Sequence, residues 1–468
     1  MSNEKSQAEL LKEQLFYKRK NAAKTCSAEE IKAADDFCEG YKAFLNESKT
    51  EREAVQYMVK KAQSFGFVPF DRDKKYAPGE KVYFNNRGKC IVLAVIGKQP
   101  LSKGVRLSAA HIDSPRLDLK QNPLYEDSEM ALFKTHYYGG IKKYQWTSIP
   151  LSLHGVMVKK DGTAVTVNIG EDESDPQFVV TDLLPHLAAE QMKRTLADGI
   201  RGEELNVLVG SRPFSDDEAG EQVKLNILNI LFEKYGVTEG DFLSAELEVV
   251  PAFAARDIGL DRSMIGAYGH DDRVCAYPAA EAIFAVSNPE YTAITCLTDK
   301  EEIGSEGNTG LNSSYLKYFI ADLAKANGEN YHTVLRNTQC LSADVNAAFD
   351  PTFPDVSERM NASFVNGGVA IMKYTGARGK SGTSDASAEF MSKVRALLDG
   401  NDIVWQSCEL GKVDAGGGGT VAMYLAALDI DVVDLGVPVL SMHAPFEVVS
   451  KLDVFMAYRA FKAFFEKA

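Results

Sequence analysis

Residues 291–302 read YTAITCLTDKEE, an apolar run that ends in four charged residues, and a glycine-rich loop follows. A short apolar run with such boundaries predicts a buried strand. In an open α/β sheet, the binding crevice lies beyond the carboxyl ends of the strands. Adjacent side chains point in different directions, so one of Glu301 and Glu302 can bind a metal ion while the other handles a proton. The segment predicts an α/β fold that delivers two carboxylates to a cleft.

Four further polar groups stand at the ends of predicted elements. They are His111-Ile-Asp113 after the run 104–110, Asp271-Asp-Arg273 at the start of an alanine-rich helical segment, Ser342-Ala-Asp344 after a short strand-like run, and Ser441-Met-His443 after the apolar run 432–440. Because strand ends converge on one crevice, these residues can meet in space. Mixed imidazole and carboxylate ligands suit Zn, Mn or Co better than Ca or Mg.

Each group alone also has an ordinary structural explanation. Glu-Glu pairs are common on solvated helices, and His-x-Asp is often a histidine bonded to a nearby carboxylate. Asp-Asp-Arg is often a helix N-cap with a surface ion pair, and Ser-Ala-Asp is usually a turn. Coincidence of all five groups is much rarer than any one of them, so the combined pattern favours a metal site.

These five motifs, in this order, resemble the M18 aminopeptidases, dinuclear metallopeptidases that include aspartyl aminopeptidase and aminopeptidase I. The resemblance covers nearly the whole chain. It implies two divalent metal ions, with zinc as the first expectation and cobalt or manganese as alternatives. The metal ligands it implies are His111, a bridging Asp271 and Asp344 for one ion, and Asp271, Glu302 and His443 for the other. It also implies Glu301 as the general base and Asp113 as the residue that orients the ring of His111.

The expected reaction follows from these roles. Two metal ions roughly 3.5–4 Å apart can share a water and lower its pKa, while one of them polarises the scissile carbonyl. Glu301 would take the proton of that water and pass it to the leaving amine. The resemblance further implies short peptides as substrates, cleaved one N-terminal residue at a time.

Two departures from the family pattern concern substrate choice. Asp350 precedes Pro351 where aspartyl aminopeptidases carry a histidine, and Tyr144 takes the place of a histidine that relatives extend into a neighbouring subunit's active site. Loss of two potential cations predicts a neutral, aliphatic N-terminal residue rather than Asp or Glu. Lys373, Arg378 or Lys380 could still supply a cation, so acid specificity stays an alternative.

Two motifs superficially resemble nucleotide-binding loops. Residues 379–381 read GKS, but Tyr374 replaces the first glycine that a Walker A loop requires. The run Gly416–Gly419 lacks the last glycine of the dinucleotide pattern, where Val421 stands. Its backbone is expected to approach a substrate or make a tight turn, which makes Gly417 a candidate substrate-binding residue. No Gly-x-Ser-x-Gly elbow of a serine hydrolase occurs.

Patterning along the chain predicts an interrupted α/β domain. Residues 28–64 are expected to form two helices, with Ser48 as the N-cap of the second. Strands are expected at 90–96 and 105–110, and a β-hairpin over 151–169. An amphipathic helix is expected from Pro445 to Lys467. We expect a catalytic domain split between residues 1–118 and 248–468, with a central mixed sheet flanked by helices, and an inserted β-rich domain at 119–247 for oligomerisation or substrate access.

Composition narrows the class of protein. The 468 residues are 45% hydrophobic and 25% charged, which is ordinary for a globular protein of two domains. A net charge of -14 disfavours nucleic acid and anionic membranes as partners. No apolar run of 18 residues occurs, and the first residues lack the apolar core of a signal peptide, so we expect a cytoplasmic protein. Seven scattered cysteines without Cys-x-x-Cys spacing predict reduced thiols.

The resemblance also implies a homo-oligomer, expected to be a dodecamer that encloses the active sites, with residues 119–247 making much of the contact. A second functional class stays open. The chain could be a metal-free assembly or peptide-binding protein derived from a peptidase, because a fold does not guarantee activity.

Overall fold

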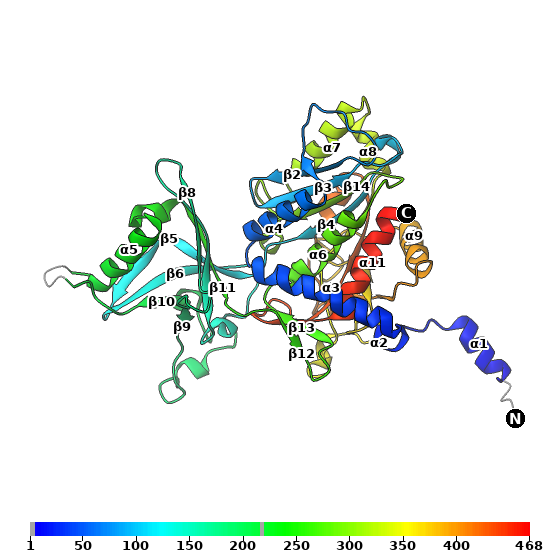
Figure 1. The fold of residues 1–468 in the computed structure, drawn as a ribbon. Coiled ribbons are helices and arrows are strands. Elements are labelled where there is room, and N and C mark those ends of the chain that lie inside the picture. The colour runs from blue at the N-terminus through cyan, green and yellow to red at the C-terminus, as the bar shows by residue number, and fades with distance from the viewer. Residues whose placement is uncertain (1–4, 216–219) are drawn as a thin grey trace.

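The computed structural model describes residues 5–215 and 220–468, and Figure 1 shows that they form two lobes. The larger lobe holds a nine-stranded sheet covered by helices, and the smaller lobe holds a seven-stranded sheet. Five short strands form a third sheet. The α/β class predicted from the sequence is confirmed.

The nine-stranded sheet is mixed, as expected. Its order is β1-β2-β3-β14-β4-β15-β19-β17-β18. The strands are β1 (Val68–Pro69), β2 (Lys81–Asn86), β3 (Cys90–Val95), β4 (Arg106–His111), β14 (Ala293–Thr298), β15 (Gln339–Ser342), β17 (Val369–Met372), β18 (Trp405–Ser407) and β19 (Asp431–Gly436). Strands β14, β4, β15 and β19 run parallel, whereas β3 and β17 run antiparallel to their inner neighbours. Every residue of β3, β4 and β14 is buried because helices cover both faces.

Two groups of helices cover the two faces of this sheet (Figure 1). One face packs against α3 (Ala28–Glu47), α4 (Glu51–Ser64), α6 (His270–Ala285), α9 (Ala388–Asp399) and α11 (Lys451–Lys467). The other face packs against α7 (Tyr315–Ala326), α8 (Tyr331–Asn337) and α10 (Ala422–Ala426). Each helix hides an apolar stripe against the sheet, which gives the three layers of an α/β fold.

The seven-stranded sheet is antiparallel throughout, in the order β8-β7-β11-β5-β6-β10-β9. Its strands are β5 (Arg116–Asp127), β6 (Met130–Tyr138), β7 (Leu151–Val158), β8 (Ala164–Ile169), β9 (Val179–Val180), β10 (Asn206–Gly210) and β11 (Ala245–Pro251), and α5 (Gln222–Tyr235) packs against it. The predicted hairpin is confirmed, because β7 and β8 pair with Leu153 opposite Ile169. The division of the chain at residues 119 and 247 stays a prediction.

The third sheet corrects two sequence expectations. It contains β12 (Arg256–Ile258), β13 (Met264–Ala267), β16 (Asn346–Ala347), β20 (Pro438–Leu440) and β21 (Glu447–Ser450). The apolar run 432–440 is two strands in two sheets, since β19 ends at Gly436 and β20 begins at Pro438. No helix begins at Pro445: residues 447–450 pair with β13 and β20, and α11 starts at Lys451. Periodicity alone could not reveal that non-local pairing.

The two helices predicted over residues 28–64 are confirmed, but the predicted cap is wrong. Thr50, not Ser48, is the N-cap of α4, because its side chain accepts a hydrogen bond from the Glu53 amide, 3.3 Å away. Ser48 instead ends α3.

Several remaining features complete the fold. The N-terminal helix α1 (Gln7–Leu15) buries no residue and stands apart from both lobes in Figure 1. The other short helices are α2 (Ala22–Thr25), η1 (Leu101–Lys103), η2 (Lys143–Trp146), η3 (Gln191–Lys193), η4 (Gly202–Glu204), η5 (Glu239–Ser244), η6 (Glu301–Ile303) and η7 (Pro354–Val356). All seven cysteines are unpaired, as predicted. No helix in the described part of the chain has the length and apolarity to cross a membrane.

Candidate metal centre

Strand ends bring four of the predicted site residues together. His111 is the last residue of β4, and it stands opposite Thr298 at the end of the parallel strand β14. Glu301 and Glu302 lie in the turn η6 just beyond β14. Asp344 follows β15, the neighbour of β4 on its other side. Because the three strands run parallel, their carboxyl ends deliver these side chains to one edge of the sheet, as the sequence predicted.

Two further ligand candidates reach the same place from outside the nine-stranded sheet. Asp271 lies in the first turn of α6, which follows strand β13 of the third sheet. His443 lies in the loop between β20 and β21 of that sheet and has a left-handed backbone, with φ 65°. The site is therefore built where two sheets meet.

Asp271 stands between the two histidines. Its Oδ1 lies 3.2 Å from Nε2 of His111, and its Oδ2 lies 3.1 Å from Nε2 of His443. Asp344 is on the His111 side, with 3.8 Å between its Oδ1 and Nε2 of His111. Glu302 is on the His443 side, with 3.6 Å between its Oε2 and Nε2 of His443. Asp271 therefore lies between a His111 side and a His443 side of the cluster.

The donor set and its spacing fit divalent ions. Two ligand atoms about 2.0–2.1 Å from one tetrahedral zinc ion lie about 3.3 Å apart. The distances of 3.2 and 3.1 Å between the Asp271 oxygens and the two Nε2 atoms are close to this value. Among the described residues, buried Oε1 of Glu302 has no hydrogen-bond partner, and buried Nε2 of His111 faces Asp271 at 3.2 Å without forming a hydrogen bond. Such atoms are costly to bury unless a ligand completes them. Within the described residues, His111, Glu301 and Asp344, and likewise His111, Asp271 and Glu302, come close enough to hold an ion.

The carboxylates of the site outnumber the cationic partners. Burial, reinforced by the charge of Asp344, raises the pKa of Glu301 to about 8. Burial and the nearby charge of Asp271 raise the pKa of Glu302 well above its usual range. Asp271 differs from these glutamates: burial opposes its ionisation, but the nearby imidazoles of His111 and His443 outweigh that effect and lower its pKa. The uncompensated negative charge is suited to a cation.

Asp113 connects His111 to the glutamate turn. Nδ1 of His111 lies 3.0 Å from the backbone oxygen of Asp113 and 3.3 Å from its Oδ1. The carboxylate accepts the amides of Glu301 and Glu302, at 3.1 and 3.2 Å, and the hydroxyl of Tyr138, at 2.8 Å. One buried side chain therefore bonds the base candidate, one ligand candidate and the histidine ring.

A family model described as "Aminopeptidase I zinc metalloprotease (M18)" matches residues 44–465. This chain belongs to the M18 family of aminopeptidases. A protein of Clostridium acetobutylicum named "Probable M18 family aminopeptidase 1" is 48% identical over 458 residues, which cover 96% of this chain and 98% of that protein. The family resemblance predicted from the motifs is confirmed, and with it a metal-dependent aminopeptidase.

Solved structures of M18 proteins share the fold. The crystal structure of the Thermotoga maritima M18 aminopeptidase is 46% identical and has a TM-score of 0.92, over 97% of this chain and all of that one. A structure of the S. cerevisiae mApe1 dodecamer is 20% identical with a TM-score of 0.75, over 93% of this chain and 97% of that one. At that identity, the second comparison concerns the fold alone.

The substrate-binding candidates of this M18 chain lie in several separate loops, unlike the metal-ligand candidates. Asp350 is half-buried, and its carboxylate accepts the Thr352 amide at 2.8 Å. Tyr144 is exposed in η2. Lys373 forms an ion pair with Asp385. Gly417 has φ 107°, and a Cβ there would lie 2.0 Å from the Gly376 oxygen, so a tight backbone approach requires glycine.

Sequence reasoning missed two groups that hold His443. Gly140 accepts a hydrogen bond from Nδ1 of His443, at 2.7 Å, which leaves Nε2 facing Asp271. Glu447 accepts the backbone amides of His443 and Asp271. The sequence offered only a weak signal for either, because Gly140 lay in a loop singled out for Tyr144 and Glu447 fell inside an expected helix.

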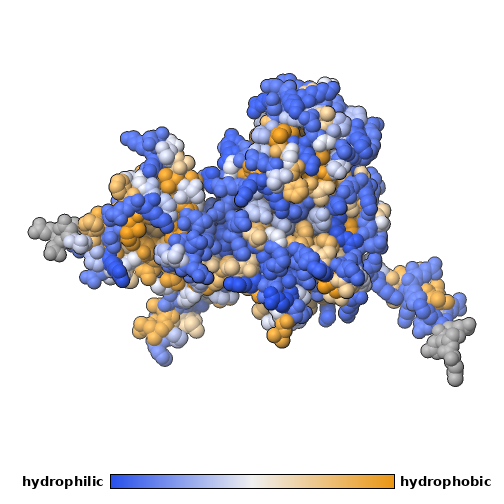
Figure 2. All heavy atoms as spheres, viewed as in Figure 1, coloured by the Kyte–Doolittle hydropathy of each residue, from blue (hydrophilic) through white to orange (hydrophobic). Residues whose placement is uncertain are grey.

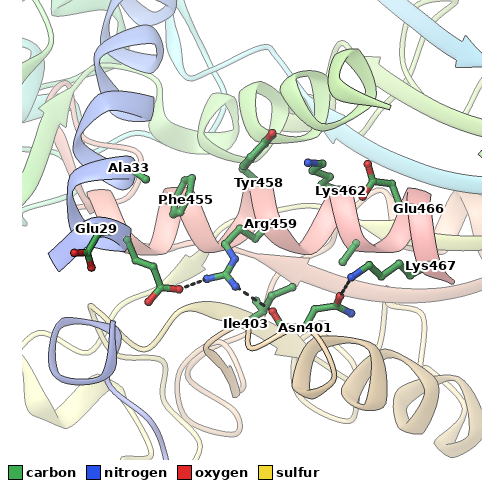
Figure 3. A pocket seen from close by; sticks show the side chains of 12 residues that line it. Glu29, Ala33, Asn401, Ile403, Phe455, Tyr458, Arg459, Lys462, Glu466 and Lys467 are labelled. Carbon is green, nitrogen blue, oxygen red and sulfur yellow. Dashed lines mark hydrogen bonds and ion pairs between the residues drawn. The ribbon is translucent and has the colours of Figure 1, made fainter. Parts of the chain in front are cut away.

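A separate cavity of about 490 Å³ lies between α3, α11 and the loop before β18 (Figure 3). Arg459 projects from α11 into it, forms an ion pair with Glu30 at 2.8 Å, and donates to the Asn401 oxygen at 3.0 Å. Its lining contains none of the site residues predicted in the M18 chain. The cavity lies between helices and is not the metal centre.

Proposed function

We propose that this M18 aminopeptidase holds two divalent metal ions, with zinc as the expected metal. His111, Asp271 and Asp344 hold one ion, and Asp271, Glu302 and His443 hold the other. The observation that carries the proposal is the position of Asp271, whose two oxygens lie 3.2 and 3.1 Å from Nε2 of the two histidines. One carboxylate that faces two imidazoles in this way is suited to bridge two ions.

Glu301 is proposed as the general base. When bound, the ions would polarise the scissile carbonyl and make a water more acidic. Glu301 takes the proton of that water as it attacks, and then delivers the proton to the leaving amine. Asp113 positions both Glu301 and His111, because its carboxylate accepts the Glu301 amide and contacts the His111 ring.

Metal removal tests the proposed mechanism. Treatment with a chelator should abolish release of N-terminal residues from short peptides, and added Zn, Co or Mn should restore it. Elemental analysis of the active protein should give two ions per chain. Unchanged turnover after verified metal removal would show that the reaction does not need them.

We propose short peptides with a neutral, aliphatic N-terminal residue as substrates. Acid-specific relatives are expected to have histidines at the positions of Asp350 and Tyr144. Asp350 carries a negative charge instead, and Tyr144 cannot supply a positive one. The ion pairs of Lys373 and Lys380 with Asp385 support the same preference, because they already compensate two of the cations that could have received an acidic side chain. Gly417 is proposed to bring backbone groups close to the peptide.

A substrate panel tests this preference. We expect leucyl substrates to exceed aspartyl and glutamyl ones in kcat/KM by about 5- to 150-fold, since an acidic side chain beside an uncompensated carboxylate costs about 1–3 kcal/mol. Asp350→Asn should narrow this ratio, whereas Asp414→Asn, a change of another loop aspartate, should not. A higher kcat/KM for aspartyl than for leucyl substrates would favour the acid-specific alternative.

We also propose a cytoplasmic homo-oligomer, most simply a dodecamer as in the yeast relative, with an inserted domain over residues 119–247 providing much of the contact. An exposed apolar group between β9 and β10 supports this, and Figure 2 shows apolar side chains on the smaller lobe. Its members are Leu183, Leu184, Leu187, Met192 and Leu196, which are between 50% and 78% exposed. Apolar groups of this kind mark contacts between proteins.

Light scattering tests the assembly. Wild-type protein should elute as a large oligomer, and the double variant Leu187→Glu with Met192→Glu should dissociate into smaller species. Leu260→Glu, at an exposed leucine of another loop, is the matched control and should leave the assembly intact. An active wild-type monomer would contradict the proposal.

A further inference from the structure

Glu447 connects the two chain segments that carry Asp271 and His443. Its Oε1 accepts the His443 amide at 2.7 Å, and its Oε2 accepts the Asp271 amide at 3.1 Å. The side chain is only 1% exposed. Both oxygens therefore face backbone donors of the two residues whose side chains meet 3.1 Å apart at the centre.

The position of Glu447 in the fold explains this connection. Glu447 is the first residue of β21 and pairs with Ala267, the last residue of β13. The chain leaves β13 toward Asp271, and it reaches β21 from His443. The two segments that carry Asp271 and His443 thus leave the sheet next to the Glu447 side chain.

The bond to His443 has a particular consequence. His443 holds a left-handed backbone, φ 65°, which is unfavourable for a residue with a Cβ. Two hydrogen bonds hold it there: its amide donates to Glu447, and its ring Nδ1 donates to the Gly140 oxygen at 2.7 Å. Without the carboxylate, the backbone beneath the imidazole loses one of these two bonds.

From this geometry we infer that Glu447 is a positioning residue that sets the separation of Asp271 and His443 and so determines affinity for the second metal ion. The inference rests on the proposed two-ion site. Asp271 and His443 both belong to the proposed second half-site. The proposed first half-site also draws on His111 and Asp344, and the two hydrogen bonds of Glu447 go to Asp271 and His443 instead. Loss of Glu447 should therefore weaken one ion more than the other.

Asp453 provides a matched control within the same region of sequence. It is a fully buried carboxylate at the start of α11 that also accepts two backbone amides, those of Asn366 at 2.8 Å and Gly368 at 2.7 Å. Neither of these residues is a proposed metal ligand. Glu447 and Asp453 thus make the same kind of bond, but only Glu447 makes it to the metal centre.

The test compares Glu447→Gln with Asp453→Asn in the full chain. Each amide keeps the shape but turns one acceptor into a donor, so each variant should melt below wild type. Zinc is titrated into chelator-treated protein, and cobalt-substituted protein is examined by absorption spectroscopy. We expect Glu447→Gln to bind the weaker ion at least about tenfold less tightly and to change the cobalt spectrum. Asp453→Asn should keep both properties. Glu447→Asp, which retains the carboxyl group but is one methylene shorter, should lie between them.

The possible outcomes distinguish the role of Glu447 from the proposed two-ion site. Wild-type protein that binds fewer than two ions overturns the two-ion site and this inference together. Wild-type protein that binds two ions, with Glu447→Gln binding both as tightly, overturns the inference alone. Equal weakening in Glu447→Gln and Asp453→Asn also overturns it, since both carboxylates would then act only on stability. If Glu447→Gln does not fold, the same comparison is made with Glu447→Asp.

Discussion

Two buried clusters of histidine and carboxylate in this protein differ in the pKa values of their glutamates. In the metal centre, burial raises the pKa of Glu301 to about 8 and raises that of Glu302 well above its usual range. The other cluster joins the lobes: His154 of β7 lies 2.7 Å from Glu53 of α4 and 3.1 Å from Glu171. Burial also opposes ionisation of these two glutamates. For Glu53, the hydrogen bond and charge of His154 outweigh burial and lower the pKa. For Glu171, His154 acts together with Lys49 and Ser152 and likewise lowers the pKa.

The difference concerns how the charges are balanced. The His154 cluster satisfies its ionised carboxylates with its own cationic groups, so it needs nothing from outside. The metal centre retains raised pKa values for Glu301 and Glu302, and buried Oε1 of Glu302 has no hydrogen-bond partner among the described residues. A histidine beside acids is thus a structural ion pair in one place and, in our proposal, a metal ligand in the other. Three predictions test this contrast.

The largest effect is expected from Glu301→Gln. The amide keeps the size of the side chain but cannot accept a proton, so kcat should fall about 100- to 10,000-fold while metal content stays at the wild-type level. Glu302→Ala should instead lose metal. Glu306→Gln, at an exposed glutamate of the same loop, should retain full activity. Metal analysis beside steady-state kinetics checks all three, and equal metal occupancy in the Glu301 and Glu302 variants would reverse our assignment of base and ligand.

Chelation should lower the melting temperature, because the metal centre depends on an added cation. A ligand at one hundred times its dissociation constant stabilises the folded state by about 2.7 kcal/mol for each site. Calorimetry with and without a chelator measures the shift. His154→Gln protein should show a shift of the same size, since its own cluster needs no ion. A melting temperature that does not respond to chelation would remove the contrast between the clusters.

The smallest effect is expected from His154→Gln. Glutamine can keep a hydrogen bond but not the charge, so the free energy of unfolding should fall by about 1–3 kcal/mol. Burial disfavours the charged ring, but bonds to Glu171 and Glu53 outweigh it and raise the pKa of His154 above 6.5. Its contribution is complete below pH 6.5 and is lost as the pH rises through the folded-state value.

The two glutamates set the other side of this pH window. Their folded pKa values lie below 4.5, so their contribution is present above that pH and is lost as the pH falls through the folded values. The stability difference between wild type and His154→Gln should be largest between about pH 4.5 and 6.5 and shrink above it. Denaturant unfolding at several pH values measures this difference. A difference that grows above pH 6.5 would show that His154 is not held in its charged form.

Local patterns predicted some elements of this protein well and others poorly. The strands β3 and β4 lie within about one residue of their expected ends, because strands that are buried on both faces are short apolar runs with polar ends. The expected helix at Pro445 is wrong over residues 445–450. There, pairing with β13 and β20 overrides the helical preference of the segment. The substrate candidates lie in loops, whose positions depend on distant contacts, so their roles stay predictions.

By itself, the sequence determined the α/β class, the family, and the residue types that gather at the strand ends. These follow from apolar runs and from polar residues placed directly after them, which are local properties of the chain. Only the tertiary structure decided that Asp271 stands between His111 and His443, that Gly140 and Glu447 hold His443, and that His154 is balanced by Glu53 and Glu171. Each of these contacts joins segments far apart in sequence, so it exists only after the sheets have paired and packed.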